Sequence, residues 1–149
     1  MPAMSIRAWA SDMAKHVVAP STDVAPGRMK LVSVNGREIG IFNLGGEYFG
    51  LLNRCPHEGA ALCSGQVIGL ALSDEPGRYR LDRPGEMIRC PWHGWEYDIR
   101  TGQSWCDPQK VRVPRFEVAR EAGEDIVKGP YIAETVAVAV ENDYLVIEI

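Results

Sequence analysis

Short stretches in which apolar and polar residues alternate recur along this chain, a pattern typical of β-strands that bury one face. The first three stretches lie close together, and the turn-forming pairs Asn35-Gly36 and Gly45-Gly46 separate them. They predict a small β-meander whose strands cover residues 28–35, 38–44 and 48–52.

Further strands are predicted over residues 67–68, 111–118, 134–141 and 144–149. Pro114 interrupts one of them, and because proline cannot donate to a β-ladder, that strand is expected at a sheet edge. The last two strands flank Asn142-Asp143 and are expected to close the fold as a hairpin. The polar stretch 121–130 is expected to be a loop.

The N-terminus follows a different period. Its apolar residues are spaced as in an amphipathic helix, at Ile6, Trp9, Ala10, Met13 and Val17. Such a helix is expected either to pack on the body of the protein or to form an oligomer contact. The predicted organisation is an N-terminal segment over 1–16, holding a short helix, and a single domain over 17–149. Within that domain, an insertion near 69–85 is expected to form an extra hairpin.

Composition agrees with a fold dominated by β-structure and narrows the partners. Among 149 residues, 15 Gly and 10 Pro favour a turn-rich architecture. The net charge of -4 gives no reason to expect nucleic acid or an anionic membrane as a partner. No membrane-spanning stretch or secretory leader is recognisable, so a cytoplasmic location is expected. In that reducing compartment, four Cys favour metal binding over disulfides.

Two short segments concentrate the residues that bind metals. Cys55-Pro56-His57 and Cys90-Pro91-Trp92-His93 each combine one cysteine with one histidine, and both open with Cys-Pro. Two thiolates on one iron and two imidazoles on the other are the ligands of one type of [2Fe–2S] cluster. Each iron would take one ligand from each segment, so the cluster would tie the two loops together. Structural zinc is the alternative, because it too is bound by Cys and His.

The residues around these ligands resemble a known family. Cys55-Pro-His-Glu-Gly-Ala-Ala-Leu and Cys90-Pro-Trp-His-Gly-Trp-Glu-Tyr-Asp strongly resemble Rieske [2Fe–2S] proteins, above all the bacterial Rieske ferredoxins of ring-hydroxylating oxygenase systems. The resemblance implies an all-β fold, an antiparallel β-sandwich with a cluster-binding subdomain built from two loops. It also implies one [2Fe–2S] cluster per chain, with Cys55 and Cys90 on one iron and His57 and His93 on the other.

Departures from the resembled family are informative. Its respiratory branch has a disulfide between the loops, but Ala60 and Trp92 stand at those positions here, so no such disulfide is expected. In the high-potential branch a Ser and a Tyr hydroxyl donate hydrogen bonds to the cluster sulfurs; here Trp95 replaces the Ser, and Tyr97 is retained. We therefore expect a reduction potential well below the top of the family range, which runs from about −150 to +300 mV.

Cys63 and Cys106 are not part of this ligand set. They are expected to be free thiols, buried or partly exposed, with a mutual disulfide as the alternative. Pro108 is the candidate for a third, proline-containing loop that the resemblance places over the cluster.

The histidine count limits the chemistry of the chain. Of three His, only His16 remains once His57 and His93 are assigned to the cluster. The mononuclear iron site of the family's oxygenases, two His and a carboxylate, therefore cannot be completed. No Gly-rich nucleotide-binding motif follows a strand either. The chain is thus expected to be a one-electron carrier, not catalytic alone, that passes electrons from a reductase to a terminal oxygenase.

Two other roles stay open at this point. The chain could be a tightly bound small subunit of a larger oxidoreductase, with the insertion near 69–85 and the N-terminal segment as binding surfaces. It could also be a redox-sensing regulatory module, whose affinity for a partner changes with the oxidation state of the cluster.

Overall fold

The computed structural model describes residues 14–56, 59–75, 78–91, 94–104 and 111–149. Strands dominate this part of the chain, and every pair of neighbouring strands is antiparallel. The expectation of an all-β fold is therefore confirmed. The strands are β1 (Lys15–Pro20), β2 (Met29–Val34), β3 (Arg37–Leu44), β4 (Glu47–Leu52), β5 (Gln66–Glu75), β6 (Arg78–Arg89), β7 (Glu96–Asp98), β8 (Arg115–Ala122) and β9 (Asp143–Glu148).

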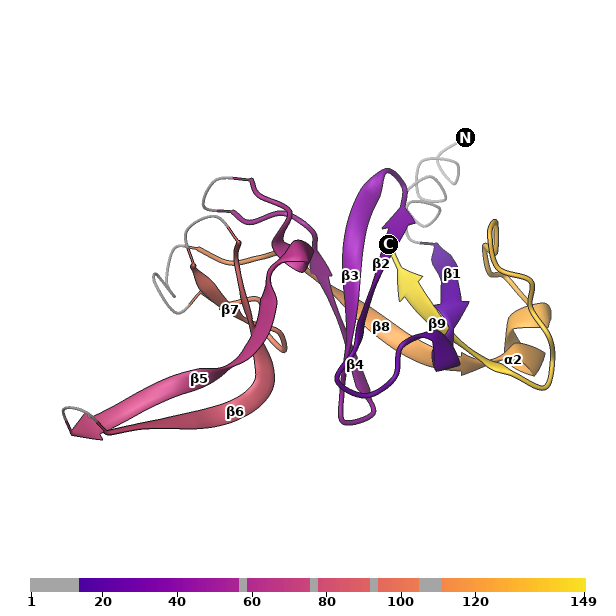
Figure 1. Cartoon of the computed structure of the whole chain (residues 1–149). Helices are drawn as coiled ribbons and strands as arrows, with labels where there is room; N and C mark the ends of the chain where they lie inside the picture. Colours follow the sequence, from indigo (N-terminus) through magenta and orange to yellow (C-terminus); the bar gives the residue numbers. More distant parts are fainter. Residues whose placement is uncertain (1–13, 57–58, 76–77, 92–93, 105–110) are drawn as a thin grey trace, which may run out of the picture.

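The strands form two sheets that lie side by side (Figure 1). The large sheet has six strands in the order β1-β9-β8-β4-β3-β2, and the small sheet has three in the order β5-β6-β7. Three short helical segments complete the described structure: η1 (Ser21–Asp23), η2 (Leu62–Ser64) and α2 (Gly123–Val127). None of the helices in the described residues is long and apolar enough to cross a membrane.

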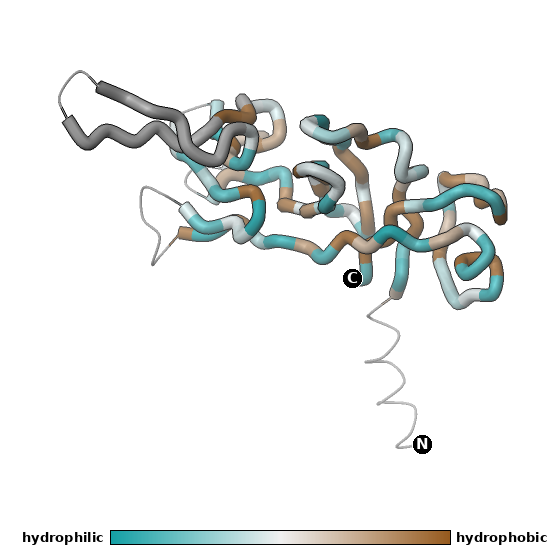
Figure 2. Tube along the Cα trace, turned by 90° about the horizontal axis from the view of Figure 1, so that it is seen from below, coloured by the Kyte–Doolittle hydropathy of each residue, from teal (hydrophilic) through white to brown (hydrophobic). Residues whose placement is uncertain are grey.

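The predicted meander forms strands β2, β3 and β4 of the large sheet. Val34 pairs with Arg37, so only Asn35 and Gly36 lie between β2 and β3. Both have positive φ, 51° and 77°, which is the backbone that a two-residue hairpin turn requires and that Asn and Gly tolerate best. Figure 2 shows brown, apolar segments and teal, polar segments following one another along the described chain.

Two apolar clusters hold the large sheet together and join it to the small one. The first lies within the large sheet and combines buried residues of β2, β3 and β9, among them Val32, Ile41 and Leu145. The second combines residues of both sheets, including Leu51 of β4 and Ile88 of β6. The metal-binding segments follow β4 and β6, so this second cluster lies beside the candidate site.

At the N-terminus, the structure differs from the helical expectation where it can be compared. Val17, which the helical spacing included, lies in strand β1, together with Lys15 and His16. β1 pairs with β9, and this partner is distant in sequence. Pairing with the last strand overrides the local helical pattern there. Most of the helix predicted over 1–16 falls on residues 1–13, which are outside the described ranges.

The edge position predicted for the strand over 111–118 is wrong. β8 begins at Arg115, after Pro114, and lies inside the large sheet between β4 and β9. Pro114 does not disturb the ladder because it uses its carbonyl, which accepts a hydrogen bond from the Leu52 amide at 2.9 Å. The stretch 121–130 is also more regular than expected, since it contains the end of β8 and the helix α2.

The closing hairpin predicted over 134–149 is only half correct. β9 forms, but residues 134–141 form no strand despite their alternation. Both sides of β9 are already occupied, by β8 and by β1. The Tyr144 hydroxyl instead accepts a hydrogen bond from the Ala139 amide (2.8 Å) and donates one to the Ala137 carbonyl (3.2 Å), so it fastens this segment without a ladder.

The insertion predicted near 69–85 is the outer part of the β5–β6 hairpin. Its two strands pair through Leu70↔Asp82 and, near the tip, Glu75↔Arg78. Figure 1 shows this hairpin as a two-stranded arm that extends away from the rest of the molecule. The short strand predicted over 67–68 is thus part of the longer strand β5.

Candidate metal centre

The first metal-binding segment starts three residues after β4. The Cys55 amide donates to the Ala60 carbonyl at 2.8 Å, and the Gly59 amide donates back to the Cys55 carbonyl at 2.6 Å. Gly59 has φ +79°, a conformation that other residues rarely adopt. The two hydrogen bonds close a tight turn that begins at Cys55 and reverses at Gly59.

The second segment starts directly after β6 and repeats this arrangement. The Cys90 amide donates to the Trp95 carbonyl at 2.8 Å, and the Gly94 amide donates back to the Cys90 carbonyl at 3.1 Å. Gly94 has φ +72°. Cysteine, amide bonds and left-handed glycine thus occur at the same spacing in both segments. Two loops of matching geometry present one cysteine each.

Both cysteines are buried, and neither forms a disulfide. Cys55 is 1% exposed and Cys90 is 2% exposed, and both belong to the apolar cluster that joins the two sheets. A thiol in such a place is either inert or bound to a soft metal, and thiolates select iron–sulfur clusters, zinc or copper(I). An apolar wall around the sulfurs excludes water, which tunes the reduction potential of any cluster held there.

One hydroxyl lies against a cysteine sulfur. The Tyr97 Oη atom of β7 is 3.2 Å from Cys55 Sγ, and Tyr97 is fully buried. Against a metal-bound thiolate, which carries no proton, the hydroxyl is the donor. This is the hydrogen bond that the resemblance implied for Tyr97. Trp95, at the position of the missing Ser, packs against the same apolar cluster instead.

The two histidines of the predicted ligand set cannot be placed, because His57 and His93 lie outside the described residues, as do Trp92, Cys106 and Pro108. Within the described ranges, no group of three or more His, Cys, Asp or Glu side chains could hold a metal ion. Two buried cysteines in matched loops, one of them contacted by a hydroxyl, nevertheless fit the sulfur side of a [2Fe–2S] cluster.

Cys63 is a separate thiol behind the first loop. It lies in η2, is buried and free, and its amide donates to Asn53 Oδ1 at 2.7 Å. Burial, reinforced by the nearby negative charge of Glu38, raises its pKa to about 12. The expectation of a free, buried thiol is confirmed for Cys63.

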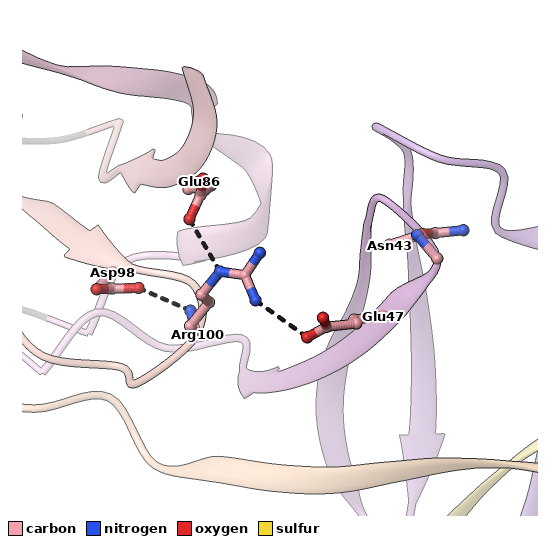
Figure 3. Close-up of polar contacts among 6 residues, drawn as sticks. Asn43, Glu47, Glu86, Asp98 and Arg100 are labelled. Carbon is pink, nitrogen blue, oxygen red and sulfur yellow. Dashed lines mark hydrogen bonds and ion pairs between the residues drawn. The ribbon is translucent and has the colours of Figure 1, made fainter. Parts of the chain in front are cut away.

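Sequence reasoning did not identify Asn53 or Arg100 as parts of the site. Asn53 links the start of the first loop to η2 through the bond to the Cys63 amide, and its own amide donates to the Glu38 carbonyl. Arg100 follows β7 and binds carboxylates of both sheets (Figure 3). Neither residue belongs to a recognisable motif, since their partners come from distant parts of the sequence.

Comparisons with known proteins agree with this geometry. Residues 14–117 match the Rieske [2Fe-2S] domain family. The chain is 26% identical to Ferredoxin CarAc of Metapseudomonas resinovorans over 113 residues, 75% of this chain and 91% of the relative. It is 25% identical to the 3-phenylpropionate/cinnamic acid dioxygenase ferredoxin subunit of Escherichia coli strain K12 over 118 residues, 79% of this chain and 96% of the relative.

Solved structures share the fold. The ferredoxin of carbazole 1,9a-dioxygenase from Nocardioides aromaticivorans IC177 has a TM-score of 0.55 at 21% identity and covers 89% of this chain and 96% of its own. A chain from the complex of reduced oxygenase and oxidized ferredoxin in carbazole 1,9a-dioxygenase has a TM-score of 0.54 at 22% identity, covering 88% and 91%. Because the family model matches most of the length of this chain, the chain belongs to the Rieske [2Fe-2S] domain family, and its cofactor is a [2Fe–2S] cluster.

Proposed function

We propose that this chain is a one-electron carrier that takes electrons from a reductase and passes them to a terminal oxygenase. The observation that carries the proposal is the pair of matched loops, which buries Cys55 and Cys90 and places the Tyr97 hydroxyl against the Cys55 sulfur. The relatives support the choice of partners, because their names describe ferredoxin components of dioxygenase systems. In this role the chain is an electron-transfer component and not catalytic by itself.

The proposed ligands are Cys55 and Cys90 on one iron and His57 and His93 on the other. The cluster, when bound, accepts and releases a single electron. The chain's own residues hold and tune it. The two cysteines fix the sulfur side in a dry, apolar environment, and Tyr97 donates a hydrogen bond that stabilises the more negative, reduced state.

The ligand set can be tested against a matched control within the chain. Cys55→Ala is expected to lose the visible absorption of the protein and the low average g of its reduced EPR spectrum. Cys63→Ala removes a thiol from the same apolar cluster but is expected to keep both signals. For the histidines, His57→Ala is the test variant and is expected to lose both signals. His16→Ala is its control and is expected to keep them. A Cys55→Ala protein that keeps the full EPR signal, or a colourless wild type with one zinc per chain, contradicts the assignment.

The carrier role has its own measurement. Protein reduced by dithionite and freed of excess reductant is mixed with cytochrome c, a general one-electron acceptor. We expect one cytochrome c to be reduced for each cluster. A stoichiometry of two, or none with an intact cluster, contradicts the proposal.

The tightly bound subunit is a second candidate, because one structural feature favours it. The β5–β6 arm extends away from the body, and a two-stranded hairpin without further support is marginally stable in water. A partner that covers the arm would stabilise it. Purification from the native host distinguishes the candidates: a free carrier sediments as a small protein, whereas a subunit sediments in a stoichiometric complex.

A cytoplasmic location is part of the main proposal. The free thiol of Cys63 agrees with a reducing compartment. Fractionation of the native host, with antibody detection of the chain, is expected to find it with soluble cytoplasmic markers. Its recovery in the periplasmic or membrane fraction contradicts that location.

A further inference from the structure

Arg100 connects the two sheets beside the metal centre. Its Nε donates to Glu86 Oε1 of β6 at 2.9 Å, and its Nη1 donates to Glu47 Oε2 of β4 at 3.1 Å. Its guanidinium carbon also lies 5.0 Å from the centre of the Phe49 ring, again in β4. One side chain thereby contacts the small sheet through Glu86 and the large sheet through Glu47 (Figure 3) and also through Phe49.

The backbone on both sides of this contact is held in place. The Arg100 amide donates to Asp98 Oδ1 at 2.8 Å, and the Ile99 amide donates to the Glu86 carbonyl at 3.0 Å. On the other side, the Gly46 amide donates to Asn43 Oδ1 at 2.8 Å, which fixes the turn that carries Glu47. These hydrogen bonds fix the backbone at both ends of the contact, so the Arg100 side chain links the end of β7 to the start of β4.

The same two strands carry the contact that tunes the cluster. Tyr97 belongs to β7, three residues before Arg100, and Cys55 follows β4, which begins at Glu47. The contact of 3.2 Å between Tyr97 Oη and Cys55 Sγ thus spans the gap that Arg100 bridges. A hydrogen bond weakens steeply as its distance and angle change, so the relative position of β4 and β7 controls its strength.

We propose that Arg100 is a positioning residue: by joining Glu86 to Glu47 and Phe49, it holds the Tyr97 hydroxyl on the Cys55 thiolate and so keeps the reduction potential of the cluster raised. The proposal rests on the function and ligands proposed above. Single ion pairs near the surface are weak, and Arg100 is 36% exposed, but three partners on two sheets define one position for the guanidinium.

Because the Arg100 side chain is partly exposed, burial does not hold it in place. Its position depends instead on its hydrogen bonds to the two carboxylates. The hydrogen bond to Glu86, and that to Glu47, raise the pKa of Arg100 above its already high value. Arg100 therefore stays charged wherever the protein is folded, and the connection between the sheets does not depend on pH in the neutral range.

The decisive variant is Glu47→Gln, because two explanations give opposite signs. Removal of a negative charge raises a reduction potential by electrostatics alone, since the reduced cluster is the more negative state. If Glu47 acts by holding Arg100, its loss instead weakens the Tyr97–Cys55 hydrogen bond and lowers the potential. We expect a fall in the redox titration, smaller than that caused by Tyr97→Phe. An unchanged or raised potential overturns the proposal.

A double-mutant cycle gives an independent result. Arg100→Gln is expected to lower the potential in the wild type and to have little further effect in a Tyr97→Phe background, because the hydrogen bond is already gone. An equal shift in both backgrounds identifies a plain charge effect and also overturns the proposal. Arg120→Gln, which removes a cation from an exposed pair with Asp143, is the control for lost charge and is expected to leave the potential nearly unchanged.

Failure of this inference is distinguishable from failure of the proposed function. If Arg100 has no positioning role, all these variants still show the visible and EPR spectra of a [2Fe–2S] cluster. If the ligand assignment is wrong, Cys55→Ala keeps those spectra, and Tyr97→Phe does not alter the potential.

Discussion

Gly40 and Cys63 are closely packed in the protein core near the metal centre. A Cβ atom at Gly40 would lie 2.3 Å from Cys63 Sγ and 3.3 Å from Phe42 Cε2. Both residues are buried. The absent side chain at Gly40 thus creates the space for the thiol, and through it β3 contacts η2.

This pair makes a stability prediction with an internal check. Gly40→Ala overpacks the site and is expected to lower the free energy of unfolding by about 1–3 kcal/mol. Cys63→Ala leaves a small cavity and is expected to cost about 1 kcal/mol. In the double variant the new methyl group occupies the space of the lost sulfur, so the two losses should not add. Urea unfolding of the four proteins measures this, and additive losses contradict the packing argument.

The raised pKa of Cys63 gives a second expectation at this scale. The unfolded thiol ionises near 9.0, whereas burial raises the pKa in the folded protein to about 12. The stabilising contribution is therefore complete below pH 9 and is lost as the pH rises from 9 to 12. The stability advantage of wild type over Cys63→Ala is expected to fall by about 1–2 kcal/mol between pH 8 and 10.5, so that it disappears or changes sign. A constant difference in urea unfolding at the two pH values rules this out.

At the scale of elements, the local sequence predicted those strands whose pairing depends on residues nearby in the chain. The meander β2–β3–β4 was predictable because Asn35-Gly36 defines a hairpin turn and the alternation defines which face is buried. β1 was not predictable, because its partner β9 lies at the other end of the chain. Residues 134–141 alternate as clearly as a strand, but no free ladder position remains beside β9. Alternation of apolar and polar residues indicates which face a strand could bury, but it does not indicate whether a neighbouring strand is free to pair with it.

In the metal centre, too, the sequence predicted the residues of local motifs and missed a residue that depends on distant contacts. Cys55, Cys90 and Tyr97 were identified from their own neighbours in sequence, and the structure places Tyr97 on Cys55. Arg100 was missed because its function depends on Glu47 and Glu86, which lie 53 and 14 residues away. Motifs record the atoms that touch a cofactor, whereas the residues that position them are visible only when the sheets are assembled.

The β5–β6 arm is expected to be independent of the cluster. In the described residues its outer strands pair with each other, and Leu70 lies opposite Asp82. Replacement of residues 71–81 by Asn-Gly therefore closes a shorter hairpin at that pair. We expect unchanged visible and EPR spectra and nearly the same midpoint of thermal unfolding. Loss of the cluster in this variant contradicts the view that the arm is a separate element, while replacement of 74–77 alone serves as the milder control.

Across the whole molecule, the proposed ligands connect the two sheets. Cys55 follows the large sheet and Cys90 follows the small one, so a cluster bound to both, as proposed, would fix the sheets to each other. The apolar cluster that joins the sheets contains the same two cysteines. Metal binding that crosses two elements contributes directly to their stability.

Iron removal is therefore expected to loosen the sheets unequally. In apo-protein prepared with a chelator, backbone amides of the Ile88–Tyr97 pair in the small sheet should exchange with deuterium much faster than in the holo-protein. Amides of the Ile41–Gly50 pair should keep most of their protection, because the large sheet has its own apolar core. Hydrogen exchange measured by NMR tests this, and cluster reconstitution should restore the slow rates. Equal acceleration in both sheets would show instead that the domain unfolds as one unit and that the cluster stabilises it globally.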